Sequence, residues 1–409
     1  MSQPPEFFRI AHLPPYPLGG IAYAVRDARL AGRDIVDLSQ VNPDLGPPPR
    51  AIDALVQAAL QPHNHRYSSS QGIARLRQAV ASWYQSHYDV ELDPDTEVVA
   101  TMGTKEGLSH LLLAAAAPGE NVLVPTPSYP IHTSAVFIAG AGFTGVPLFE
   151  SFTAAEAAGY LLQEDSDDFF DRLTLAYNRA WPRPRLLICS FPHNPTAAVV
   201  DQGFFTRLVH WAREHEVWLV HDFAYADLVY DNYRAPSLLA VPGAKECAVE
   251  CYSLSKGFSM PGWRIGFCLG NPRLLSALKK VKSYLDFGIF QPMQIAATKL
   301  LEDTSGANEL LAEHRDTYRA RRDVLVEGLR ELGWTVHTPA AGVFVWAGLP
   351  AAVASLGSLA FSERLLAEAS VAVCPGIGFA IDADGYVRFA LVENERRLRT
   401  ALTRMAEVC

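Results

Sequence analysis

Residues 248–266 read AVECYSLSKGFSMPGWRIG, and this stretch decides how the chain is interpreted. Its first five residues predict a buried strand that leads directly to Lys256. Ser253 and Ser255 flank this lysine, and Arg264 follows it in a glycine-containing turn. Burial lowers the pKa of a lysine from its usual value of about 10.4 and makes its amine a nucleophile toward carbonyl groups, while the hydroxyls and the arginine fork suit a phosphate. Taken alone, the stretch is equally compatible with a strand that ends in a surface lysine beside a salt-bridged arginine.

The surrounding chain alternates helical stretches with short apolar runs. We expect helices at 51–60 and 72–88 and strands at 97–101, 121–124, 186–189, 217–220 and 248–252. This alternation is typical of an α/β fold in which helices cover both faces of a mainly parallel sheet. The segment 151–185 mixes small and acidic residues and is interpreted as an insertion that carries one helix.

Beyond Asp286 the pattern changes, because a long helix (308–332) precedes three strands and a closing helix. The three strands are expected at 334–337, 343–346 and 386–390. This order is typical of a smaller α+β domain. We therefore predict an N-terminal arm at 1–44, a large domain at 45–290 and a small C-terminal domain at 291–409.

Polar residues follow several predicted strands at the point where each strand ends. Thr104 and Lys105 follow the first strand and precede a helix expected at 109–117, and the N-terminus of a helix binds anions. Asn194 follows the third strand, and Asp222 and Tyr225 follow the fourth. Because parallel strands end at one edge of a sheet, these side chains are expected in one crevice.

Composition excludes several classes of protein. The chain has 409 residues, which at roughly 150 residues per domain is enough for two or three domains. Its net charge of −9 argues against nucleic acid as a partner, and neither a leader peptide nor an apolar run of membrane-spanning length is apparent. The six cysteines lie mostly in apolar runs without metal-ligand spacing and predict reduced thiols in a cytoplasmic protein. His63 and His65 lack further ligands at matching spacing, so we expect loop histidines and no metal site.

Six stretches resemble the fold-type I, pyridoxal-phosphate-dependent class I/II aminotransferases over almost the whole chain. They are RYSSSQG (66–72), TMGTKEGL (101–108), FPHNPT (191–196), HDFAYADLVYD (221–231), SLSKGFSMPGWRIGF (253–267) and VRFAL (387–391). The resemblance implies an aspartate aminotransferase-like, pyridoxal-phosphate-dependent transferase fold and an enzyme that moves an α-amino group between an amino acid and a 2-oxo acid. The stretches LPPYPL, SYPIHT, PGIGF and VRFALVEN are most similar to alanine-forming glutamate–pyruvate transaminases, which are related to LL-diaminopimelate aminotransferase.

The resemblance also implies roles for the residues around the cofactor ring. Lys256 would hold the cofactor covalently and move a proton between substrate and cofactor. Asp222 would face the pyridine nitrogen and keep it protonated. Tyr225 and Asn194 would donate hydrogen bonds to the phenolic oxygen of the ring. Tyr129 would stack on the ring, with an ordinary core tyrosine as the alternative.

Phosphate and substrate contacts follow from the same resemblance. The phosphate would be bound by Gly103, Thr104, Lys105, Ser253, Ser255 and Arg264. Tyr67 would reach the site of a neighbouring subunit, which implies a homodimer with shared active sites.

Arg388 would bind the substrate α-carboxylate with its fork, with Asn194 beside it. Tyr16, the run Gln40-Val41-Asn42 and His132 occupy positions where relatives shape the side-chain pocket. Relatives typically carry glycine at the position of Val41, and diaminopimelate enzymes carry asparagine at that of Phe287. Both differences favour a small amino donor such as alanine.

Three readings remain open from sequence alone. The first is transfer between alanine or glutamate and pyruvate or 2-oxoglutarate, with methionine, aromatic amino acids or LL-diaminopimelate as other donors. The second is a C–S β-lyase, because such lyases share the residues of the cofactor site. The third, a cofactor-binding module without catalysis, is disfavoured because no basic patch or DNA-binding extension precedes the domain.

Overall fold

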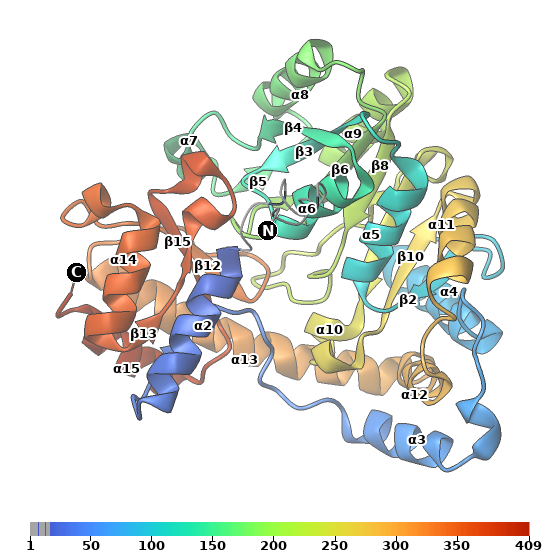
Figure 1. Ribbon diagram of the computed structural model, residues 1–409, viewed down its shortest axis with the longest axis horizontal. Coiled ribbons are helices and arrows are strands. Elements are labelled where there is room, and N and C mark those ends of the chain that lie inside the picture. The colour runs from blue at the N-terminus through green and yellow to red at the C-terminus, as the bar shows by residue number, and fades with distance from the viewer. Residues whose placement is uncertain (1–6, 8–12, 14–16, 409) are drawn as a thin grey trace, which may run out of the picture.

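Figure 1 shows a computed structural model, which describes residues 7, 13 and 17–408. A central sheet lies among helices on one side of the molecule, and a smaller part made from the C-terminal residues lies on the other. The long helix α13 (Thr304–Glu331) runs along the lower side from one part to the other. Within the described residues, no helix is both long and apolar enough to cross a membrane.

The central sheet has seven strands in the order β2–β10–β9–β8–β6–β3–β4. They are β2 (Val98–Thr101), β3 (Asn121–Thr126), β4 (Gly142–Pro147), β6 (Leu186–Ser190), β8 (Trp218–Asp222), β9 (Ala248–Ser253) and β10 (Gly266–Gly270). All neighbouring pairs from β9 to β4 are parallel, whereas β10 pairs antiparallel with both β2 and β9. The carboxyl ends of six strands therefore lie at one edge of the sheet.

Helices cover both faces of this sheet because alternate side chains of each strand point to opposite sides. In β2, Val99 packs in one apolar cluster, and its neighbours Val98 and Ala100 pack in the other. The first cluster contains residues of α5 (Thr104–Ala115), α6 (Pro130–Ala139) and α11 (Pro272–Leu285). The second contains residues of α4 (Ala74–Tyr88), α8 (Asp167–Arg179) and α9 (Gln202–Glu214). The edge of the sheet that carries the strand ends is thus held between two packed layers.

Two further helices, α3 (Pro49–Ala59) and α12 (Gln291–Glu302), pack against each other beside α4. The short helix α10 (Leu254–Gly257) follows β9 directly. Its N-cap is Ser253, whose hydroxyl accepts a hydrogen bond from the backbone N–H of Ser255 at 3.1 Å. This cap fixes the point where the chain turns from strand to helix.

The C-terminal part is built on a four-stranded antiparallel sheet, β11–β12–β15–β14. Its elements are β11 (Thr335–Val336), β12 (Phe344–Gly348), β14 (Cys374–Pro375), β15 (Tyr386–Ala390), α14 (Ser358–Arg364) and α15 (Glu395–Met405). A separate apolar cluster forms its core together with α13. The α-carboxylate arginine expected from sequence, Arg388, lies in the central strand β15.

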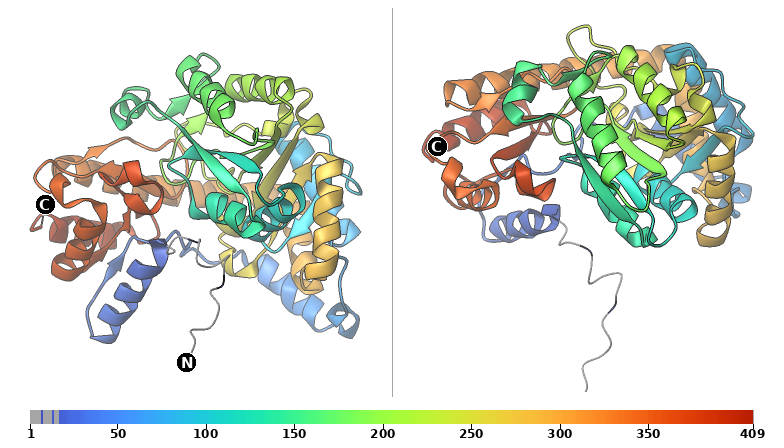
Figure 2. Two further views of the ribbon diagram at one scale, coloured as in Figure 1. Left: turned by 45° about the horizontal axis from the view of Figure 1, so that its top comes forward. Right: turned by 90° about the horizontal axis from the view of Figure 1, so that it is seen from above.

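The described residues of the predicted N-terminal arm pack on the C-terminal part. Helix α2 (Pro17–Leu30) lies along that part in both views of Figure 2 and packs Ile21 and Val25 against Leu366 and Ala372. Strand β1 (Val36–Asp37) pairs parallel with β13 (Val371–Ala372). Residues 38–44 then continue from this pair toward the central sheet.

The predicted fold class is confirmed, and two local predictions were wrong. Segment 151–185 contains two helices, α7 (Phe152–Ala157) and α8, and strand β5 (Leu161–Leu162), which pairs with β7 (Val199–Val200). Helix α5 begins at Thr104 rather than 109, because Gly103 adopts a positive φ of 75° and turns the chain into the helix. The boundaries 1–44, 45–290 and 291–409 stay a prediction.

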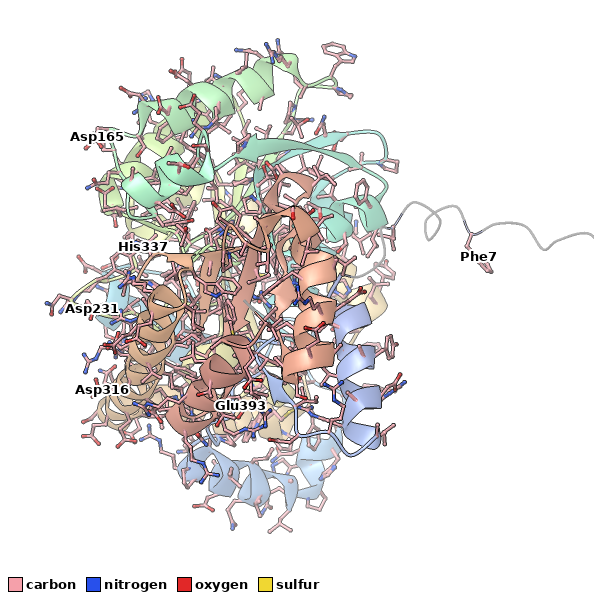
Figure 3. All side chains as sticks on the ribbon, turned by 90° about the vertical axis from the view of Figure 1, so that its left-hand side faces the viewer. Phe7, Asp165, Asp231, Asp316, His337 and Glu393 are labelled. Carbon is pink, nitrogen blue, oxygen red and sulfur yellow. The ribbon has the colours of Figure 1, made fainter. Side chains whose placement is uncertain are left out.

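Segment 151–185 also contacts the C-terminal part. The ring of Tyr160 stacks on that of His337, with 5.4 Å between the ring centroids. Figure 3 shows His337 on the same side of the molecule as Asp165 of this segment. The segment therefore contacts the C-terminal part through Tyr160.

Candidate active site

A cavity of about 740 Å³ lies at the carboxyl edge of the central sheet. Arg388 of the C-terminal sheet and residues 40–42 contribute to its wall, so both parts of the molecule shape it. Its lining residues are Gly19, Ala22, Gln40, Val41, Asn42, Thr104, Lys105, Tyr129, Ile131, Ser190, Asn194, Asp222, Ala224, Tyr225, Ser253, Ser255, Lys256, Pro261, Arg264 and Arg388. The structure thus brings together the predicted site residues apart from Gly103, Tyr67, His132 and Tyr16.

Lys256 lies on α10 at the floor of this cavity. Its Nζ donates a hydrogen bond of 2.6 Å to the backbone oxygen of Val41. Burial lowers the pKa of Lys256 to about 7, and the positive charges of Arg388 and Arg264 act in the same direction. A lysine with a pKa near neutrality is a nucleophile and a base under ordinary conditions.

Asp222, the last residue of β8, is held by a histidine that the sequence had placed in the side-chain pocket. His132 Nε2 lies 3.0 Å from Asp222 Oδ2, and His132 Nδ1 lies 3.0 Å from the hydroxyl of Ser128. Because a carboxylate only accepts, Nε2 carries the hydrogen and Nδ1 accepts from Ser128. His132 does not line the cavity but orients Asp222 from behind. The only available sequence signal was its place in the helix after the β3 strand end.

The second oxygen of Asp222, Oδ1, is buried and has no hydrogen-bond partner among the described residues. A buried carboxylate oxygen without a partner is costly unless a ligand supplies a donor. Asp222 also lines the cavity. The site therefore suits a ligand with a protonated ring nitrogen opposite this oxygen.

Asn194, Tyr225 and Arg388 form a second group. Arg388 is 1% exposed, and its Nη1 donates to Asn194 Oδ1 at 2.6 Å, while its Nη2 donates to the backbone oxygen of Ser39 at 3.2 Å. Asn194 Nδ2 lies 3.5 Å from the hydroxyl of Tyr225. Burial raises the pKa of Tyr225, so its hydroxyl remains a donor. Arg388 Nε has no partner within the described part of the chain, which leaves capacity for an anionic ligand.

The expected phosphate site lies where α5 begins. The first N–H groups of a helix have no acceptor within the helix, and Thr104 and Lys105 occupy this first turn. Arg264 approaches from the chain just before β10, and its Nη2 donates to the backbone oxygen of Met102 at 3.2 Å. A Cβ on Gly103 would crowd that same Nη2, and the positive φ of 75° at this position also favours glycine. Ser253 and Ser255 line the cavity close by.

The remaining predicted site residues are Tyr129, Val41, Tyr67 and Tyr16. Tyr129 lines the cavity, and its ring makes an edge contact with His132 at 5.8 Å between centroids. Val41 lines the cavity and accepts from Lys256 through its backbone. Tyr67 is 86% exposed, contacts Phe287, and does not line the cavity of its own chain. Tyr16 lies outside the described residues.

These donors fit a phosphorylated aromatic aldehyde. A partly buried lysine of lowered pKa, a carboxylate with an unpaired oxygen and a helix N-terminus with an arginine are the groups that such a molecule requires. The fold and this set of side chains together define a pyridoxal-phosphate-dependent transferase of the aspartate aminotransferase-like fold.

Comparison with known proteins gives the family. Residues 33–405 match the model of aminotransferase class I and II, and the chain belongs to this family. It is 47% identical over 397 residues to the glutamate-pyruvate aminotransferase AlaC of Escherichia coli K12, with 97% of this chain and 92% of that protein covered. It is 40% identical over 403 residues to the LL-diaminopimelate aminotransferase of Moorella thermoacetica, with 98% of each covered. The solved structure of aspartate aminotransferase from Thermus thermophilus with maleate covers both chains fully, at 29% identity and a TM-score of 0.89. The predicted enzyme class and its cofactor, pyridoxal phosphate, are confirmed.

Proposed function

We propose that this aminotransferase moves an amino group between alanine and glutamate and their 2-oxo acids, pyruvate and 2-oxoglutarate. The observation that carries amino-group transfer from an α-amino acid is a buried arginine fork at Arg388, in one cavity with the amine of Lys256. The name of the Escherichia coli relative, a glutamate-pyruvate aminotransferase, supports this choice of substrates.

The residues divide the chemistry among themselves. When bound, pyridoxal phosphate supplies an aldehyde that combines with amines and a ring that accepts the electrons of the broken bond. Asp222, oriented by His132, would hold a proton at the ring nitrogen. Lys256, with a pKa near 7, would move the proton between the substrate Cα and the C4′ carbon of the cofactor. Tyr225 and Asn194 would donate hydrogen bonds to the phenolic oxygen.

Substrate orientation falls to Arg388. Its fork would bind both oxygens of the α-carboxylate, a planar geometry that lysine does not offer. Asn194 holds one arm of this fork at 2.6 Å, so the guanidinium is oriented before the substrate arrives. An interaction with the α-carboxylate is common to all amino-acid substrates and does not select among them.

Selection among amino donors is assigned to the residues around Val41. Its side chain is larger than the glycine typical of relatives, and Gln40 and Asn42 line the cavity on either side. A larger side chain at this position narrows the cavity, which favours the methyl group of alanine over a long side chain that carries a second amino group and a second carboxylate. LL-diaminopimelate, the substrate of the Moorella thermoacetica relative, is the competing donor.

A matrix of amino donors against 2-oxo acids tests the proposal. Purified enzyme with alanine and 2-oxoglutarate should form glutamate and pyruvate faster than any other pair. A higher kcat/KM for LL-diaminopimelate would reassign the substrate, and no product across the panel would reject the function. Pyruvate and ammonia released from cystathionine without a 2-oxo acid would instead identify a lyase.

The protein is further proposed to act as a homodimer with shared active sites. Exposed apolar side chains lie on α3 and its C-cap, at the end of α11 and on the segment after α11: Ile52, Val56, Leu60, Tyr284, Leu285, Phe287 and Phe290. An apolar surface of this kind indicates a covered interface. Tyr67 lies beside it, in contact with Phe287, and so could reach a neighbouring subunit.

Complementation between two inactive variants tests this arrangement. Mixed and refolded Lys256→Ala and Tyr67→Ala chains should regain activity, because one site of each hybrid dimer then carries both lesions and the other carries neither. No regain, with dimers present by sedimentation, would place Tyr67 in the site of its own chain or in none. The cytoplasmic location predicted from the cysteines stays a prediction, which cell fractionation would test.

A further inference from the structure

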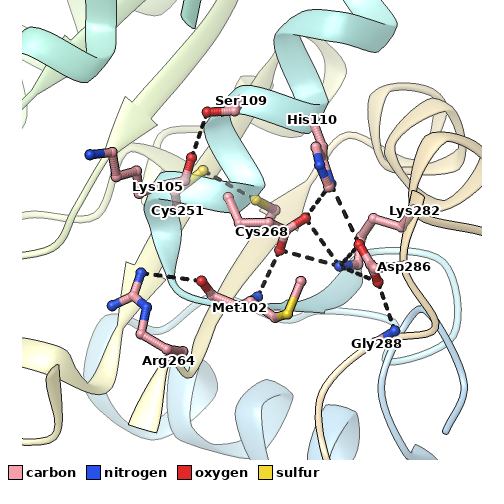
Figure 4. A network of polar contacts seen from close by, with 11 residues as sticks. Met102, Lys105, Ser109, His110, Cys251, Arg264, Cys268, Lys282, Asp286 and Gly288 are labelled. Atoms are coloured by element: carbon pink, nitrogen blue, oxygen red, sulfur yellow. Dashed lines mark hydrogen bonds and ion pairs between the residues drawn. The ribbon is translucent and has the colours of Figure 1, made fainter. Parts of the chain in front are cut away.

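A cluster of ionisable side chains lies outside the cavity, behind the start of α5 (Figure 4). The side chain of Lys282, on α11, is fully buried at 0% exposure. Its Nζ lies 3.1 and 3.2 Å from the two carboxylate oxygens of Glu106 and 3.2 Å from both oxygens of Asp286. His110 Nδ1 lies 2.5 Å from Glu106 and 3.6 Å from Asp286. One ammonium group therefore lies between two carboxylates and pairs with both.

Three side chains of this cluster are also spaced like the ligands of a metal ion. Ligand atoms of Glu106, His110 and Asp286 all lie within 4.8 Å of one another. The ammonium of Lys282, however, contacts all four carboxylate oxygens and already supplies the positive charge that a metal ion would bring. The contacts therefore favour a buried ion-pair network over a metal site.

Glu106 ties this network to the candidate active site. It stands in the first turn of α5, two residues after Thr104, which lines the cavity. Burial raises the pKa of Glu106, but the closeness of His110 and the charge of Lys282 outweigh it and leave the pKa lowered. The carboxylate is therefore negative at neutral pH, in the same helical turn as the groups expected to bind phosphate.

An uncompensated carboxylate at this position would compete with a phosphate, because both seek the N–H groups of a helix N-terminus and nearby cations. In the structure it is directed away from them. Glu106 Oε2 accepts from the backbone N–H of Met102 at 2.7 Å, on the side of Lys282. The backbone oxygen of Met102 accepts from Arg264. The backbone of Met102 thus connects Glu106 to the arginine expected to bind phosphate, and Figure 4 shows Met102 and Arg264.

We infer that Lys282 is a positioning residue for the phosphate site. It compensates the Glu106 carboxylate and holds it aside, so that the first turn of α5 and Arg264 are left for the cofactor phosphate. The inference rests on the proposed assignment of the phosphate to these groups.

The test compares two ligands that differ only in the phosphate. Cofactor-free enzyme is titrated with pyridoxal phosphate and with pyridoxal. The dissociation constant of pyridoxal divided by that of pyridoxal phosphate measures the contribution of the phosphate. In Lys282→Met this ratio should fall at least tenfold, while the affinity for pyridoxal stays within twofold of wild type. In the double variant Lys282→Met/Glu106→Gln the ratio should return to within threefold of wild type, because the charge that needed compensation is gone and the amide oxygen still accepts from Met102.

Controls separate this role from a merely structural one. Lys280→Met replaces an exposed lysine of the same helix and should leave both affinities unchanged. An unchanged ratio in Lys282→Met, or an equal loss for both ligands, overturns the inference, and so does a folded double variant without recovery. Where the single variant does not fold, Glu106→Gln decides, because its ratio should stay or rise, and a fall of more than threefold contradicts the proposed compensation. Failure of the functional proposal would look different: wild-type enzyme would bind both ligands alike, or bind the cofactor without transferring amino groups.

Discussion

Arg388→Ala is the variant that tests the substrate site most directly. The guanidinium is 1% exposed and is held by Asn194 and by the backbone oxygen of Ser39, so no neighbouring cation replaces it without rearrangement. Each hydrogen bond to a charged group contributes about 1.5–3 kcal/mol, so the loss of a two-bond fork costs about 3–6 kcal/mol. At about 1.4 kcal/mol per factor of ten, kcat/KM should fall by roughly 10²–10⁴.

The assay is steady-state transamination with several amino donors and both 2-oxo acids. Because every substrate carries the same α-carboxylate, kcat/KM should fall by a similar factor for all of them, mainly through KM. Arg388→Lys keeps the charge without the fork and should recover part of the loss. Cofactor affinity should stay near that of wild type, since Arg388 lies away from the phosphate site.

A second readout comes from the cofactor-free protein. The charge of Arg388 helps to lower the pKa of Lys256, so its removal should raise that pKa above the value of about 7. A loss confined to one amino acid would refute the assignment, because Arg388 would then read a side chain rather than the common carboxylate.

Three further predictions follow from contacts around the cavity. Lys256 has a lowered pKa in the folded chain, so the unfolded chain binds more protons above pH 7. The free energy of unfolding of cofactor-free enzyme should therefore rise with pH by up to about 3 kcal/mol between pH 7 and 9.5, relative to Lys256→Met, as measured by urea unfolding. Equal pH slopes for the two proteins would contradict the burial of the amine. His132→Phe removes a hydrogen bond to the Asp222 carboxylate and should lower kcat by about 10–100-fold with little change in KM, and a purely KM effect would speak against an orienting role. Gly103→Ala places a side chain at a positive φ, which costs about 1–2 kcal/mol, and its Cβ would crowd Arg264. Fluorescence titration should therefore show at least tenfold weaker binding of the cofactor. Normal binding would show that Arg264 is dispensable for the phosphate.

The sequence predicted those parts of the site that follow strand ends. Lys256, Asp222 and Asn194 each come shortly after an apolar run, and the sheet topology then requires them to meet at one edge. Residues that act through others left no such pattern. His132 stands inside a helix, and its contact with Asp222 joins positions 90 residues apart.

The errors in the fold have local causes. The start of α5 was placed late because TKEG reads as a polar loop, whereas the positive φ of Gly103 allows the helix to begin immediately after it. Segment 151–185 was assigned one helix, because its first helix has only six residues and its strand only two. Such short elements are stabilised by contacts such as that between Tyr160 and His337, which no local pattern reveals.

The reversed direction of β10 explains why Lys256, expected to hold the cofactor, and Arg264, expected to bind its phosphate, lie so close together along the chain. Its register pairs Gly266 with Ser253, so β10 starts where β9 stops. Had this strand run the same way as its neighbours, the chain would first have had to cross back over the sheet, which takes a dozen or more residues. Lys256 and Arg264 would then lie on separate segments of the chain. Instead the short connection between β9 and β10 carries both residues, so an insertion or deletion between them would shift the position of Lys256 relative to that of Arg264.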